Sequence, residues 1–190
     1  MTDSPRRAEL ALRLAAVRQR ISAACEAAGR AAEEVTLIAV TKTWPASDVR
    51  LLSELGVTDI GENRDAEAAP KAAQCADLDL IWHFVGQLQT NKCNSVVRYA
   101  TFVHSVDRLR LIRALGAAAR RAERVIQCLI EVSLDGDPAR GGTRAGPGRG
   151  DGDRPAYHEA RRRVCQAARK RGGGPGRAAV RGGDIRRHER

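Results

Sequence analysis

The sequence predicts an α/β fold in which strands and helices alternate around a parallel sheet. Short runs rich in β-branched residues are each bounded by turn signals, which is typical of buried strands, and a helical apolar period follows most of them. Five strands in a row follow this pattern. Such alternation favours parallel strands joined by right-handed crossovers. Periodicity alone leaves a doubly wound sheet and a barrel equally open.

An amphipathic helix precedes the alternation. Ser4 and Pro5 are typical of a helix start, and Gly29 is typical of a stop. Leucine, valine and isoleucine recur between them at helical spacing. The following pattern predicts strands at 35–41, 57–60, 79–84, 101–105 and 125–132, with helices from Pro45 to Gly56, around 63–75 and 88–98, and after a cap at Asp107.

The composition of the chain changes near residue 140. Residues 1–138 carry 18 Lys and Arg against 18 Asp and Glu, whereas residues 139–190 carry 15 against 5. The net charge of +10 therefore lies in the last 52 residues, which also hold 12 of the 18 glycines. Such a segment buries too little apolar surface to offset its ordering entropy. We expect a folded domain at 1–142 and a disordered Arg/Gly-rich tail at 143–190.

Cysteine usage and hydropathy indicate the compartment. Five cysteines are scattered without a Cys-x-x-Cys pair, which favours reduced thiols over a disulfide framework or a zinc site. No apolar run approaches the ~20 residues that span a bilayer, and the polar N-terminus lacks the pattern of a signal peptide. We expect a cytoplasmic protein.

Lys42 is the first candidate for chemistry. It closes the apolar run that begins at Val35, and the turn Thr43-Trp44-Pro45 follows at once. A lysine at the carboxyl end of a strand lies where α/β folds place their sites. There its amine can lose a proton and attack an aldehyde. The alternative is a solvated lysine at a strand end.

Four segments together carry a family resemblance. They are Ala39-Val40-Thr41-Lys42-Thr43, Ile60-Gly61-Glu62-Asn63, the run from Ile81-Trp82-His83-Phe84 to Leu88-Gln89-Thr90-Asn91-Lys92, and Val103-His104-Ser105-Val106-Asp107-Arg108. Over residues 8–142 the chain resembles the pyridoxal phosphate homeostasis family of the YggS/PROSC type. The resemblance implies a (β/α)8 barrel like the N-terminal barrel of alanine racemase. It therefore selects a partial TIM-type barrel of about five units, although a complete barrel usually needs about 250 residues.

The resemblance also implies a function. Members of this family hold pyridoxal 5′-phosphate (PLP) as a Schiff base in the cytosol, and they are thought to buffer vitamin B6 or to deliver it to apo PLP-dependent enzymes. No robust turnover is assigned to them, and full-length relatives look monomeric. Lys42 then becomes the Schiff-base lysine of this chain.

The same resemblance nominates four further cofactor-binding residues. Asn63 either hydrogen-bonds the cofactor or caps the next helix. His83 faces away from Trp82 and Phe84 on the third strand, toward either the barrel interior or the helices, and His104 has the same ambiguity on the fourth. Arg140 stands where the family commonly has a lysine. An arginine keeps the charge but cannot form a Schiff base.

Two motifs of the family's later half are absent from the sequence. These are a serine-methionine-glycine-methionine-serine segment and a valine-arginine-isoleucine-glycine-threonine segment, which look like the phosphate cradle and the partner of the pyridine nitrogen. The only methionine is Met1. We therefore expect a barrel truncated or frameshifted after about residue 140, with PLP binding impaired by the loss of the phosphate-binding half.

Two other functions fit parts of the sequence. Clustered arginines in the tail predict salt-dependent, nonspecific binding to nucleic acid. That tail has one aromatic residue, Tyr157, and no recognisable reading module, which argues against a specific nucleic-acid partner. A PLP-dependent racemase commonly uses a catalytic tyrosine, yet neither Tyr99 nor Tyr157 ends a predicted strand. Metal binding has no motif to support it.

Overall fold

A computed structural model describes residues 4–133 and 141–144 of the chain. The first element is α1 (Pro5–Ala27). The hydroxyl oxygen of Ser4 accepts a hydrogen bond from the backbone N–H of Arg7, and Pro5 occupies the first turn, as predicted. The side chain of Leu14 packs this helix onto an apolar cluster that includes Val49.

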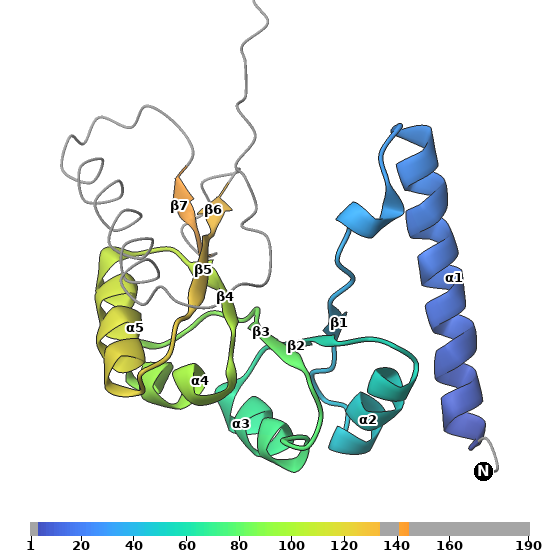
Figure 1. Cartoon of the computed structure of the whole chain (residues 1–190). Coiled ribbons are helices and arrows are strands. Elements are labelled where there is room, and N and C mark those ends of the chain that lie inside the picture. The colour runs from blue at the N-terminus through green and yellow to red at the C-terminus, as the bar shows by residue number, and fades with distance from the viewer. Residues whose placement is uncertain (1–3, 134–140, 145–190) are drawn as a thin grey trace, which may run out of the picture.

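Five parallel strands form one sheet in the order of the chain (Figure 1). They are β1 (Ala39–Val40), β2 (Asp59–Glu62), β3 (Ile81–Phe84), β4 (Phe102–Val106) and β5 (Gln127–Ile130). A doubly wound sheet reverses its strand order at a switch point, whereas consecutive barrel strands stay neighbours all the way round. The observed order is that of a barrel wall, so the partial-barrel prediction is confirmed.

Helices cover one face of this sheet (Figure 1). They are α2 (Ala46–Glu54), α3 (Asp65–Gln74), α4 (Cys93–Tyr99) and α5 (Leu109–Arg121), with short 3-10 turns η1 (Ala32–Glu34) and η2 (Thr90–Lys92). Ile60 and Trp82 join one buried apolar cluster beneath them, and Phe84 and Val103 join a second. Because strand side chains alternate, the residues between these positions point to the opposite, inner face.

A second, two-stranded sheet continues from β5. It pairs β6 (Val132–Ser133) in parallel with β7 (Thr143–Arg144). The backbone N–H of Thr143 donates to the carbonyl oxygen of Glu131 at 2.8 Å. The predicted disordered tail at 143–190 falls outside the described residues apart from the two of β7, and so does the suggested frameshift.

Several expected boundaries differ from the structure. The strand predicted at 125–132, for example, is divided into β5 and β6. The strand predicted at 35–41 is reduced to Ala39–Val40, because β2 is its only strand partner among the described residues. The helix predicted at 88–98 starts as η2 and becomes α-helical only at Cys93. The cap at Asp107 was a wrong prediction: Arg108 is the N-cap of α5, and the Asp107 carboxylate pairs with the Arg108 guanidinium at 2.5 Å instead.

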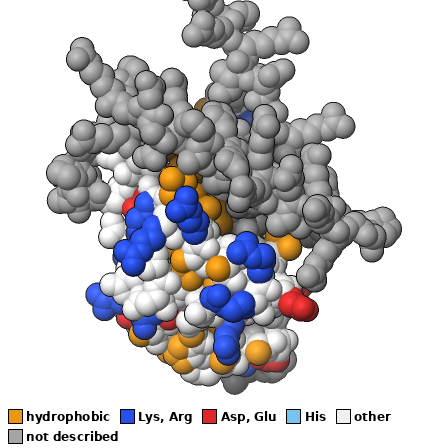
Figure 2. Space-filling model, turned by 90° about the vertical axis from the view of Figure 1, so that its left-hand side faces the viewer, with side chains coloured by type: hydrophobic (Ala, Val, Ile, Leu, Met, Phe, Trp, Pro, Cys, Tyr) orange, Lys and Arg blue, Asp and Glu red, His pale blue; other side chains and the backbone are white. Residues whose placement is uncertain are grey.

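On the face that carries α5, basic side chains lie among apolar ones (Figure 2). Exposed arginines on this helix are Arg110, Arg113, Arg120 and Arg121. Its apolar residues Leu111 and Leu115 are buried instead in the second cluster. This division is that of a surface helix packed on a sheet. No helix in the described part of the chain is long and apolar enough to cross a membrane.

Candidate functional site

The carboxyl ends of the five strands meet at one edge of the sheet. Lys42 lies two residues beyond β1, and Asn63 directly follows β2. Ser105 lies near the end of β4, and Glu131 directly follows β5. This edge is where barrels of this type carry their chemistry. The structure thus brings Lys42 and Asn63 to the same end of two neighbouring strands.

Lys42 is exposed and starts a tight turn. The backbone N–H of Trp44 donates to the carbonyl oxygen of Thr41 at 3.1 Å. Thr43 has φ of 68°, in the left-handed region that β-branched residues rarely adopt. Such strain persists only where the surroundings over-determine the backbone, and it concentrates at functional sites. The lysine amine therefore stands in solvent on a turn with a defined and strained conformation.

A buried ion pair lies directly behind this turn. Lys71 of α3 and Glu62 of β2 have side chains 7% and 0% exposed, and Lys71 Nζ lies 2.5 Å from Glu62 Oε1. The same Nζ donates to the carbonyl oxygen of Thr41 at 2.8 Å. The hydroxyl of Thr41 donates to Glu62 Oε1 at 2.7 Å. Sequence reasoning missed this cluster, although Glu62 belongs to the quoted Gly-Glu-Asn motif.

Asn63 is held against the end of β3. A Cβ built on Gly86 would overlap the backbone carbonyl and the side-chain oxygen of Asn63, so no other residue fits there without movement. The hydroxyl of Ser105 donates to the carbonyl oxygen of Gly86 from the other side. The N-cap of α3 is Arg64 rather than Asn63, which removes the capping alternative. Close packing thus links the ends of β2, β3 and β4.

The two candidate histidines contact each other on the inner face. His83 Nδ1 lies 2.9 Å from His104 Nε2, and His83 Nε2 lies 2.9 Å from a carboxylate oxygen of Asp59. The ring of Phe102 stacks on that of His83, with centroids 4.6 Å apart. His83 is buried and both of its ring nitrogens are engaged by protein groups. It therefore has no ring nitrogen left for a ligand, and it can act only through its neighbours.

Asp59 sets the direction of this chain of hydrogen bonds. A carboxylate only accepts, so in a neutral His83 ring Nε2 carries the proton and Nδ1 accepts. His104 Nε2 must then donate, which leaves His104 Nδ1 as the acceptor of a neutral ring. Burial, and next the neighbouring His83, lower the pKa of His104 below its ordinary value. The neutral, proton-accepting form of His104 is therefore favoured near neutral pH.

The last predicted residue, Arg140, lies outside the described residues. Its neighbour Gly141 lies close to Gln87 and Glu131, because a Cβ there would fall 2.5 Å from Gln87 Nε2 and 3.0 Å from Glu131 Oε2. Glu131 Oε2 is buried without a hydrogen-bond partner. Gln87 after β3, Glu131 after β5 and Gly141 before β7 thus lie close together beside the same edge. Within the described residues no cluster of three metal-ligating side chains occurs.

Similarity to known proteins bears on this edge. A pyridoxal phosphate homeostasis protein of Mycobacterium leprae is 42% identical over 152 residues, which cover 72% of this chain and 59% of that protein. A protein of the same name from Escherichia coli is 35% identical over 137 residues. The solved structure of PipY from Synechococcus elongatus with PLP bound is 30% identical, with a TM-score of 0.58, and the chain covers 82% of it. The chain belongs to the pyridoxal phosphate homeostasis family.

The family match covers only part of its curated members. The chain spans about 59% of the length of the mycobacterial relative. Alanine racemase from Streptomyces coelicolor, at 20% identity and a TM-score of 0.56, shows the shared barrel fold. No protein-family model matches the chain. The curated relatives confirm the predicted family, and the solved structures confirm the predicted fold class.

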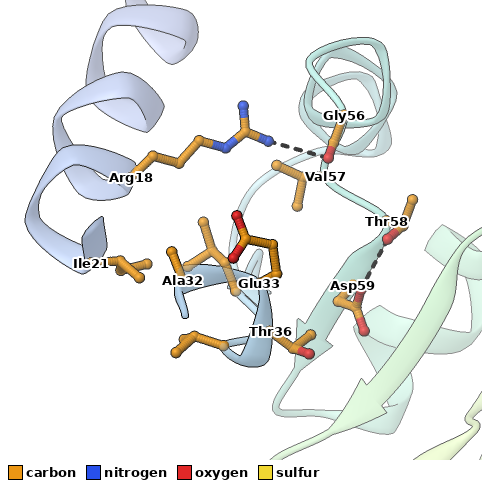
Figure 3. A pocket seen from close by; sticks show the side chains of 11 residues that line it. Arg18, Ile21, Ala32, Glu33, Thr36, Gly56, Val57, Thr58 and Asp59 are labelled. Atoms are coloured by element: carbon orange, nitrogen blue, oxygen red, sulfur yellow. Dashed lines mark hydrogen bonds between the residues drawn. The ribbon is translucent and has the colours of Figure 1, made fainter. Parts of the chain in front are cut away.

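A cavity of about 370 Å³ lies beside the amino ends of β1 and β2 (Figure 3). Lys42 follows the carboxyl end of β1, at the opposite end of that strand. The cavity is lined by residues of α1, η1 and the amino ends of β1 and β2, among them Arg18, Thr36 and Asp59. The Arg18 guanidinium donates to the backbone carbonyls of Leu55 and Gly56 at 3.3 and 3.2 Å. This cation is therefore occupied in joining α1 to the end of α2. The cavity and Lys42 are separate features of the sheet.

Proposed function

We propose that this chain binds PLP covalently through Lys42 and serves in vitamin B6 homeostasis. The observation that carries the proposal is an exposed primary amine on a strained turn at the carboxyl edge of a barrel wall. The bound PLP in PipY, a family member, supports the choice of cofactor. Attachment would join Lys42 Nζ to the aldehyde carbon with the loss of one water.

The donor set around Lys42 fits such a group. Asn63 offers an amide at the end of the neighbouring strand, and neutral His104 offers an acceptor on the inner face. When bound, PLP supplies an electrophilic aldehyde and an anionic phosphate. We propose Lys42 as the attachment point, Asn63 and His104 as polar contacts, and His83 as a residue that orients His104. We propose that Arg140 supplies a positive charge that binds the phosphate.

Partners and location follow from the same role. We propose that the chain passes PLP to apo forms of PLP-dependent enzymes. The described cysteines, Cys25, Cys75, Cys93 and Cys128, are free thiols, which supports a reducing compartment such as the cytoplasm.

An absorbance titration tests the attachment. The 190-residue chain is titrated with PLP, and the visible band of a lysine Schiff base is followed. Lys42→Arg keeps the charge but removes the nucleophilic amine, so we expect the band to vanish. Lys92→Arg, at an exposed lysine in η2, is the matched control and should titrate as the unmodified chain does. An equal band in both variants would refute the proposal.

A further inference from the structure

The buried ion pair of Glu62 and Lys71 binds both the side chain and the main chain of one residue, Thr41. Lys71 Nζ donates to the carbonyl oxygen of Thr41 at 2.8 Å, and Glu62 Oε1 accepts from the hydroxyl of Thr41 at 2.7 Å. Thr41 directly precedes Lys42. The backbone N–H of Thr41 also donates to the carbonyl oxygen of Gly61 at 2.9 Å. Together with the hydrogen bond that the Trp44 N–H donates to the Thr41 carbonyl oxygen, four hydrogen bonds thus fix the residue that leads into Lys42.

The far side of Lys42 is held by the same helix. Glu67 lies one helical turn before Lys71 on α3, so the two side chains project from one face. Glu67 Oε2 accepts a hydrogen bond from the backbone N–H of Thr43 at 3.2 Å. This contact holds the amide of the residue whose φ is 68°. Residues on both sides of Lys42 are therefore bound by α3.

The stability of the fold does not explain this ion pair. Burying two charges removes them from water, and replacing a buried pair by neutral groups of similar volume is often neutral or stabilising. Glu62 Oε2 is moreover buried without a hydrogen-bond partner, which adds to the cost of keeping the pair. The side-chain hydrogen bonds that Glu62 and Lys71 make beyond each other both go to Thr41. Their arrangement is that of a support for the turn.

We infer that Glu62, Lys71 and Glu67 position the Lys42 turn so that its amine projects toward an incoming aldehyde. This inference rests on the proposed function of Lys42. The ion pair supports the residue before Lys42, and Glu67 supports the residue after it. The three are positioning residues, because none of them reaches the amine itself. Removing the support should free the turn while leaving the barrel wall in place.

The test compares a neutralised pair with a matched control. Glu62→Gln combined with Lys71→Met removes both charges and the donor to the Thr41 carbonyl, so no unpaired charge is left buried. Arg50→Met combined with Asp77→Asn removes an exposed pair, 2.7 Å apart, that ties α2 to the end of α3 without touching the turn. Thr41→Val, which removes only the hydroxyl donor, serves if the neutralised pair does not fold.

Two readouts separate this inference from the proposed function. Amide hydrogen exchange at Thr43 and Trp44 reports the turn without any cofactor, and we expect it to accelerate about tenfold in the neutralised pair. Thr41→Val should give a smaller acceleration, and the control should give none. The rate of PLP trapping at Lys42 should fall in parallel. Unchanged exchange at both amides in the folded variants would overturn the inference. Faster exchange in a chain that never traps PLP would support the positioning role and refute the proposed function instead.

Discussion

His104 Nε2 lies 2.9 Å from Nδ1 of His83, and His83 Nε2 lies 2.9 Å from a carboxylate oxygen of Asp59. A carboxylate and two imidazoles therefore form one chain of hydrogen bonds that ends at Nδ1 of His104. Because the carboxylate can only accept, both rings are restricted to one tautomer while they are neutral.

The first prediction concerns these tautomers. Nitrogen NMR of the rings should find both histidines protonated at Nε2 when neutral. Asp59→Asn replaces an acceptor by a group that can also donate, so we expect it to permit the reversed chain, with protons at Nδ1. The ring signals are assigned with His104→Gln. Protonation of His104 at Nδ1 in the unmodified chain would contradict the proposed direction of the hydrogen bonds.

The second prediction concerns pH. The pKa of His104 in the folded protein is lowered from 6.5, chiefly by burial and then by His83. The unfolded chain therefore binds more protons in the window below about pH 6.5, and the free energy of unfolding should fall as the pH drops through it. Urea unfolding at several pH values measures this slope. His104→Gln should flatten it, and an unchanged slope in that variant would show that other groups cause it.

The third prediction concerns Gly86. An added Cβ would overlap the backbone carbonyl of Asn63, which cannot move away as a flexible side-chain end could. We expect Gly86→Ala to lower the free energy of unfolding by about 1–3 kcal/mol. Gly116→Ala is the control, because its Cβ would meet only the end of the Arg120 side chain at 3.5 Å. That helical substitution should stabilise by about 0.5–1 kcal/mol. Equal effects at the two glycines would contradict the tight packing at Asn63.

The fourth prediction concerns the strained turn. Thr43→Gly should relieve about 1–2 kcal/mol of left-handed strain, offset by about 0.5–1 kcal/mol of added chain entropy in the unfolded state. We expect stability in urea to stay level or to rise, while PLP trapping at Lys42 slows. Thr36→Gly, at an exposed position without positive φ, should only destabilise. A clear loss of stability in Thr43→Gly would mean that the turn is not strained.

Local signals in the sequence predicted much of the fold. Ser4 and Pro5 start α1 because capping and a fixed φ act within a single turn. Alternation along β3 placed His83 opposite Trp82 and Phe84, and the structure buries those two aromatic residues under the helices. The length of β1 was not predictable in the same way, because the hydrogen bonds that define a strand depend on the neighbouring strands.

Less of the candidate site than of the fold could be predicted from the sequence. Lys42 and Asn63 stand at strand ends, which a run of apolar residues reveals. The pairing of Lys71 with Glu62 depends instead on how α3 docks against β1 and β2, and no spacing rule contains that information. The engagement of His83 by Asp59 and His104 likewise spans three strands. Contacts between elements were the part that required a structure.

Borohydride reduction locates the attachment point of PLP, which we propose to be Lys42. The 190-residue chain is incubated with PLP, reduced with borohydride and digested, and the pyridoxyl adduct is located by peptide mass. A single adduct at Lys42, absent from Lys42→Ala, is the predicted result, because Lys71 is buried in its ion pair and Lys92 belongs to the 3-10 turn η2 rather than to a strand end. Adducts spread over Lys42, Lys92 and Lys170, or no adduct at all, would show that Lys42 is not a selective attachment point.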